Sequence, residues 1–373
     1  MKQLSTGLEK YFFQLSILSW LLGFAYDAII TIKNSRFDAL DWKITQFHVS
    51  YWEFGFVKRG VVGSITSPIF SLLQLKEAGQ IAFIIAIDAA LFLMFVALIH
   101  KSLKSEQVCK KSITLIRAIL IFSPVGFMQW SFDIGRLDHF VYILLFWACN
   151  LLIKKKFFQV GFTLAFSTLV HEVTFLFGSA AILIVLASFR NKKTAKCMIA
   201  ELSAIFLPAL TIFVAIIIFG NIESEVLLAQ LSESAIGRGA EVWRRGALDP
   251  NLRLSLFQYF IIVSYALAVL ITFFQHFKNA VGIFFTAGAF ALLALLYLAG
   301  ADYSRWVHAS FISFTIASVF LMQQSQNLVE HNRGILQKLS IFLLILPLGP
   351  IGIVDGLPYL ARILGYARKL VMA

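Results

Sequence analysis

The sequence predicts an all-α, polytopic membrane protein with about 10 to 12 transmembrane helices, taking about 20 apolar residues per span. Of its 373 residues, 59% are hydrophobic and only 14% are charged, whereas soluble domains carry about 25% charged residues. The apolar residues form continuous runs rather than the alternating pattern of barrel strands. These observations favour helices that cross a lipid bilayer.

The first apolar run follows the basic start "MKQLSTGLEK" and lacks a small-residue cleavage site, so we expect a retained transmembrane helix rather than a signal peptide. Ten further runs follow it along the chain. In order, the eleven predicted spans are 11–32, 80–99, 113–130, 139–153, 157–171, 173–189, 199–220, 257–276, 280–299, 305–324 and 338–355.

Residues 61–79, "VVGSITSPIFSLLQLKEAG", are only moderately apolar and contain a proline. We predict a re-entrant or interfacial helix here, within an outer loop that covers residues 33–79. The other long polar stretch, 221–256, is predicted to be an outer loop that gates access of the acceptor. Taken as a whole, the sequence predicts one membrane domain over residues 1–373.

Orientation is predicted from three short basic loops, "KSLKSEQVCKK", "KKK" and "RNKKTAK". By the positive-inside rule these loops are cytoplasmic, and so is the N-terminus. The net charge of +12 is explained by this topology, so no nucleic-acid partner is expected. The three cysteines lack metal-ligand spacing, and neither a disulfide nor a metal site is predicted.

Ionisable residues gather on the predicted outer side of the membrane in five groups. The groups are Lys58 and Arg59; Asp133, Arg136, Asp138 and His139; His171 and Glu172; Arg238, Glu241, Arg244 and Arg245; and Asp302, Arg305 and His308.

Some of these residues have structural explanations. Arg305 suits an interfacial anchor, and Asp133 or Asp138 suits a cap of the following helix. Inside the spans, Asp27, Asp88 and Arg117 are expected to pair with one another.

His171 and Glu172 are different, because they interrupt a long apolar run. Ionisable residues at such depth in a membrane usually serve a function.

Separated arginines and lysines suit a diphosphate, because guanidinium groups grip its oxygens and stay charged when partly desolvated. A carboxylate or imidazole nearby can take a proton from a sugar hydroxyl. This combination fits glycosyl transfer from a lipid diphosphate at the outer leaflet. No nucleotide-binding motif accompanies it, and no cofactor is expected.

The order of features over residues 133–186 resembles bacterial Wzy-type polymerases of O-antigen, capsule and exopolysaccharide, especially the EpsG-like branch. An arginine heads a helix in "DIGRLDHF", a basic turn "KKK" follows, and a histidine begins the next apolar run in "VHEVTF". Arg136 and His171 occupy the corresponding positions. The sequence departs from the pattern after Arg136, where Leu137 stands in place of the usual glutamine.

The resemblance implies an enzyme of the bacterial inner membrane that joins undecaprenyl-diphosphate-linked repeat units at the periplasmic face. A flippase and a chain-length regulator would be its partners. In these terms the expected roles divide into catalysis by His171, Glu172, Asp133 and Asp138, diphosphate binding by Arg136, Lys58, Arg59, Arg238, Arg244, Arg245 and Arg305, and orientation by Asp302 and His139.

Three other functions stay open. A GT-C glycosyltransferase using polyprenyl-phosphate sugars would place a catalytic aspartate in the first outer loop, where Asp38 and Asp41 lie. A transporter of lipid-linked saccharide would also carry charges within its helices. A structural partner in an envelope assembly would make the five groups a coincidence.

Overall fold

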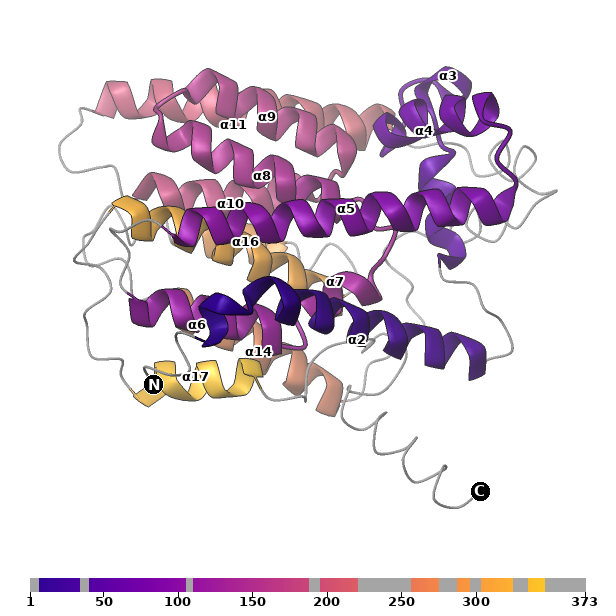
Figure 1. Ribbon diagram of the computed structural model, residues 1–373. Coiled ribbons are helices and arrows are strands. Elements are labelled where there is room, and N and C mark those ends of the chain that lie inside the picture. Colours follow the sequence, from indigo (N-terminus) through magenta and orange to yellow (C-terminus); the bar gives the residue numbers. More distant parts are fainter. Residues whose placement is uncertain are drawn as a thin grey trace, which may run out of the picture. The chain divides into compact units, whose positions relative to one another are not determined.

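A computed structural model describes residues 7–33, 40–104, 110–187, 195–220, 256–274, 287–295, 303–324 and 335–345, and within these ranges all regular structure is helical (Figure 1). Four stretches of the described residues are long and apolar enough to cross a membrane. They are Glu77–Leu103, Ser112–Phe132, Lys196–Phe219 and Arg305–Gln323. The predicted class, a helical membrane protein, is therefore confirmed, whereas the number of spans and their orientation stay predictions.

The helices coincide closely with the apolar runs of the sequence. For example, α8 covers Asp138–Ile153 where 139–153 was predicted, and α9 covers Phe157–Val170 where 157–171 was predicted. The span predicted at 113–130 is interrupted, because the turn at 123–126 separates α6 (Lys110–Phe122) from α7 (Phe127–Phe132).

The chain divides into two compact units. The first comprises Met1–Ile29, Val96–Asp133 and Ala247–Ala373, and the second comprises Ile30–Phe95 and Ile134–Gly246. The expected single membrane domain over 1–373 stays a prediction.

The second unit holds most of the predicted site. Besides α8 and α9, its elements are η1 (Asp41–Phe47), α3 (Tyr51–Phe54), α4 (Gly60–Leu72), most of α5 (Glu77–Leu103), α10 (Thr174–Ala187) and α11 (Ala195–Phe219). Within this unit α9 packs most extensively against α11 and then against α8 (Figure 1).

Small residues allow α9 and α11 to approach closely. A Cβ added at Gly161 would lie 2.1 Å from the carbonyl oxygen of Ala204. One turn later, Ala165 packs with Leu164 and Ala209 in a buried cluster. Small residues four apart favour such close packing of membrane helices, so "GFTLA" in α9 explains this contact.

The segment predicted as re-entrant or interfacial is helical from Gly60 to Leu72, with Pro68 inside the helix. It is tied to the residues before it, because Gly63 lies against the backbone of Val49 and the Thr66 hydroxyl donates to the Phe47 carbonyl at 2.5 Å. This packing fixes the start of α4. Its position in a membrane stays a prediction.

The first unit contains most of α2 (Phe12–Lys33), the end of α5, α6, α7, α14 (Leu256–Phe274), α16 (Tyr303–Gln324) and α17 (Ile335–Ile345), with a further helical stretch at 287–295. Its α16 is almost fully buried, because 94% of the residues in its 18-residue apolar stretch lie inside the protein. In α11 of the second unit, only 17% of the residues in such a stretch are buried.

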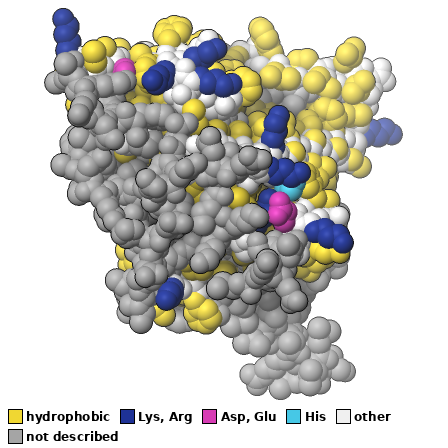
Figure 2. Space-filling view, turned by 60° about the vertical axis from the view of Figure 1, so that its left-hand side comes forward, with side chains coloured by type: hydrophobic (Ala, Val, Ile, Leu, Met, Phe, Trp, Pro, Cys, Tyr) yellow, Lys and Arg dark blue, Asp and Glu magenta, His cyan; other side chains and the backbone are white. Residues whose placement is uncertain are grey.

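The exposed surface of the described helices is strongly apolar. In the part of Figure 2 where side chains are coloured by type, hydrophobic side chains predominate, with Lys and Arg side chains among them. On α9 and α11 the exposed residues include Phe158 (73%), Phe162 (68%) and Ile218 (61%). Such a surface suits lipid rather than water.

Candidate functional site

Several helix ends of the second unit meet around one polar cluster. The chain leaves α9 at Val170, turns sharply through His171 and Glu172, and enters α10 at Thr174. The turn is closed by two backbone bonds, from His171 N–H to the Ser167 carbonyl and from Thr174 N–H to the His171 carbonyl, both 3.0 Å. Two consecutive ionisable side chains are thereby held at a helix–helix corner.

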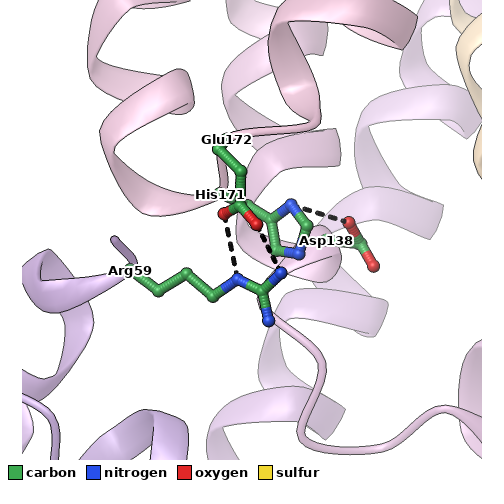
Figure 3. Close-up of polar contacts among 4 residues, drawn as sticks. All are labelled: Arg59, Asp138, His171 and Glu172. Carbon is green, nitrogen blue, oxygen red and sulfur yellow. Dashed lines mark hydrogen bonds and ion pairs between the residues drawn. The ribbon is translucent and has the colours of Figure 1, made fainter. Parts of the chain in front are cut away.

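Arg59 reaches this corner from the start of α4. Its guanidinium donates to both carboxylate oxygens of Glu172, with Nε to Oε2 at 2.9 Å and Nη2 to Oε1 at 2.5 Å (Figure 3). The two side chains are 17% and 18% exposed. This bidentate geometry is the arrangement in which arginine holds carboxylates and phosphates most specifically.

His171 adjoins this pair and faces a second carboxylate. Its Nδ1 lies 3.9 Å from Oδ1 of Asp138, in the first turn of α8 (Figure 3). That separation is too long for a hydrogen bond. Both side chains are buried, with exposures of 1% and 2%.

The corner therefore holds one bidentate pair at its exposed edge and a looser His–Asp pair beneath the surface.

The cluster has distinct electrostatics. Burial by itself raises the pKa of Glu172, but Arg59 and His171 outweigh it and hold that pKa well below its usual range. Burial lowers the pKa of Lys58, and the adjacent Arg59 lowers it further, against the opposing charge of Glu172. Glu172 is consequently a carboxylate near neutral pH and a weak proton acceptor.

The backbone around Arg59 is also fixed. Arg59 has φ 65° and ψ 9°, the left-handed conformation that non-glycine residues rarely adopt. On its N-terminal side, Lys58 N–H donates to the carbonyl of Gly220 at the end of α11, at 2.9 Å. The direction of Arg59 is thus set by the fold.

A second acid–base pair lies in the same unit but is entirely buried. Oδ2 of Asp88, on α5, accepts from His139 Nδ1–H at 2.9 Å and from Gly135 N–H at 2.8 Å. Gly135 has φ 82°, and a Cβ there would lie 2.9 Å from the Leu40 side chain. Asp88 therefore secures the turn that leads into α8.

No local sequence pattern indicates that Asp88 pairs with His139. The pairing expected among Asp27, Asp88 and Arg117 did not include His139, which is 51 residues away from Asp88 along the chain. In the first unit, the Arg117 guanidinium lies over the Phe12 ring, 5.5 Å from its centroid.

The cap predicted for α8 is not provided by an aspartate. Leu137 is the N-cap residue, without a side-chain cap bond, because Asp138 already belongs to the first turn. Asp133 ends α7 instead, and its carboxylate accepts from Gln129 Nε2 at 2.9 Å. A carboxylate in the first turn still interacts favourably with the helix dipole.

Two other residues predicted to bind diphosphate, Arg136 and Arg305, lie within the described ranges. Arg136 is partly exposed in the turn before α8. Arg305 belongs to the first unit, is 5% exposed, and lies with its guanidinium 4.6 Å from the centroid of the Trp306 ring. Arg238, Arg244, Arg245 and Asp302 lie outside the described residues, as do Asp38 and the loop at 221–255.

Within the described ranges, no group of three or more His, Cys, Asp or Glu residues has the arrangement of a metal site. The cluster at the α9–α10 corner offers two cationic side chains, Lys58 and Arg59, the carboxylates of Glu172 and Asp138, and the buried imidazole of His171.

The chain was compared with protein-family models, curated proteins and solved structures, and none of them matches it.

Proposed function

We propose that this protein is a membrane glycosyltransferase that polymerises saccharide units carried on a polyprenyl diphosphate. The observation that carries the proposal is the meeting of Arg59, Asp138, His171 and Glu172, from three separate parts of the sequence, at one corner of an apolar helical unit. Lipid-facing helices suit a lipid-linked substrate, and cations beside an imidazole suit transfer from a diphosphate.

In the proposed reaction, a hydroxyl oxygen of the acceptor sugar forms a bond to the anomeric carbon of the donor. The bond between that carbon and the diphosphate oxygen breaks, and the lipid diphosphate leaves with the bonding electrons. His171 takes the hydroxyl proton. Arg59, Lys58 and Arg136 stabilise the charge that develops on the leaving diphosphate.

His171 is a better base than Glu172 for this step. Arg59 engages both oxygens of Glu172 and holds its pKa low, which weakens it as a proton acceptor. Asp138, facing His171 Nδ1, would orient the imidazole and stabilise its protonated form.

In the full proposal, the protein lies in the bacterial inner membrane with a cytoplasmic N-terminus. It has about 10 to 12 spans, a re-entrant or interfacial helix at 60–72, and its site at the periplasmic face. Undecaprenyl-diphosphate-linked oligosaccharide is its substrate.

The test is complementation of a gene deletion, with surface polysaccharide and lipid-linked saccharides separated on one gel. We expect the deletion strain to accumulate single repeat units on lipid, and wild type but not His171→Ala to restore the ladder. Fluorescence-detected size exclusion checks that each variant folds.

A lipid-linked unit that is one sugar short would instead assign a single-addition transferase of the GT-C kind. Complete units confined to the cytoplasmic leaflet would assign a transporter. Either result would overturn the polymerase proposal.

A further inference from the structure

The arginine fork at the start of α4 already holds an oxyanion. The two Glu172 oxygens accept from Nε and Nη2 of Arg59 at 2.9 and 2.5 Å. A phosphate group presents two oxygens to arginine in the same bidentate manner. Glu172 thus occupies the position in which a phosphate would bind Arg59.

The pair lies where an incoming anion can reach it. Arg59 and Glu172 are 17% and 18% exposed, whereas His171 and Asp138 behind them are 1% and 2% exposed. A base that is 1% exposed is closed to an acceptor hydroxyl. Some side chain of the corner therefore has to move before the proposed reaction, and the partly exposed member adjoining His171 is Glu172.

The cation is held more firmly than the carboxylate. Arg59 sits in a left-handed backbone conformation, between Lys58, whose N–H is bonded to Gly220, and the first turn of α4. Such strained positions persist where the surroundings fix them, and they concentrate at ligand sites. Glu172 instead lies in the short connection between two helices. An exchange of partners would leave Arg59 in place and displace Glu172.

We propose that Glu172 is an internal competitor that fills the Arg59 oxyanion site until a diphosphate displaces it. The inference rests on the proposed function for its natural ligand, the diphosphate of a lipid-linked saccharide. The displaced carboxylate would still adjoin His171, where a negative charge stabilises the imidazolium formed when the base takes its proton. Diphosphate binding and proton transfer would then be linked through one side chain.

The experiment measures binding of inorganic pyrophosphate to the purified full-length protein in detergent, at one fixed ionic strength. Glu172→Gln removes the competing charge, and we expect it to bind pyrophosphate about tenfold or more tightly than wild type. Arg59→Gln should lose this binding. Unchanged or weaker binding by a folded Glu172→Gln protein would overturn the inference.

Two further variants separate competition from a structural role. Glu172→Asp keeps the charge but shortens the side chain, so it should bind pyrophosphate more tightly than wild type even if Glu172→Gln fails to fold. The exchange Arg59→Glu with Glu172→Arg keeps a pair of opposite charges while moving the cation off α4. If that double variant binds pyrophosphate as wild type does, the site is not the Arg59 fork.

Failure of the inference is distinguishable from failure of the proposed function. Tighter pyrophosphate binding by Glu172→Gln, combined with a wild-type protein that restores no ladder, would support the competitor and reject the polymerase. A ladder that requires the protein, combined with unchanged pyrophosphate binding by Glu172→Gln, would retain the polymerase and reject the competitor.

Discussion

Two acid–base pairs of the second unit share similar chemistry and differ in position. Asp88 and His139 are 4% and 1% exposed, and the carboxylate also accepts a backbone N–H from Gly135. Glu172 and Arg59 are 18% and 17% exposed, at a corner between helices. The first pair completes the interior of a turn, whereas the second can exchange one anion for another. Position relative to the surface, rather than residue type, separates a structural pair from a candidate binding pair.

The largest expected effect on stability comes from the buried pair. Asp88→Ala would leave the His139 imidazole and the Gly135 N–H without their carboxylate, and loss of one partner of a buried pair costs about 3 kcal/mol or more. We expect a large fall in the apparent melting temperature in detergent, measured by fluorescence-detected size exclusion.

Glu172→Gln is the matched change in the partly exposed Arg59–Glu172 pair and should lower the free energy of unfolding by about 1 kcal/mol. Asp88→Asn keeps one acceptor oxygen for the Gly135 N–H, so it should lower the melting temperature less than Asp88→Ala does. If Glu172→Gln destabilises the protein more than Asp88→Ala does, the distinction between the two pairs is wrong.

Substitutions of His139 and of His171 are expected to differ in their effect on activity. Asparagine at 139 can donate from its side-chain amide to Asp88 in place of His139 Nδ1–H. We therefore expect His139→Asn to retain polymer synthesis. Asparagine at 171 cannot accept a proton near neutral pH, and removing a general base costs about 100-fold or more in rate. Rates of polymer formation in membrane vesicles, normalised to folded protein, measure the difference, and equal losses in both variants would refute it.

The smallest expected effect is a dependence on pH. Because the pKa of Glu172 is lowered in the folded protein, its ion pair stabilises the fold above the pKa of an unfolded glutamate, about 4.3. That contribution is lost as the pH falls from there towards the folded pKa. The stability difference between wild type and Glu172→Gln should thus be constant from about pH 7 to pH 5 and shrink below about pH 4. A difference that changes between pH 7 and pH 5 would contradict this assignment.

Much of the fold was predictable because lipid imposes a simple rule, namely continuous apolar runs of fixed length. The ends of α8 and α9 fell within a residue of their predicted limits. The turn that splits 113–130 was not predicted, although "SPVG" contains both a proline and a glycine.

The site was partly predictable for a related reason. His171 and Glu172 stood out as charges inside an apolar run, and Lys58 and Arg59 were expected on the same side. Their pairing could not be predicted, since 113 residues separate Arg59 from Glu172 and no local pattern records which helix ends meet. For the same reason Asp88 was not matched with His139.

The proposed function assigns glycosyl transfer from a lipid diphosphate to the corner that holds the Arg59–Glu172 and His171–Asp138 pairs. The most direct measurement reconstitutes purified protein in proteoliposomes with the lipid-linked saccharides that accumulate in a deletion strain. We predict that wild type and His139→Asn elongate these saccharides and release lipid diphosphate, while His171→Asn and Arg59→Gln do neither. Elongation by His171→Asn at the wild-type rate would rule out His171 as the base, and no elongation by the wild-type protein would rule out the polymerase.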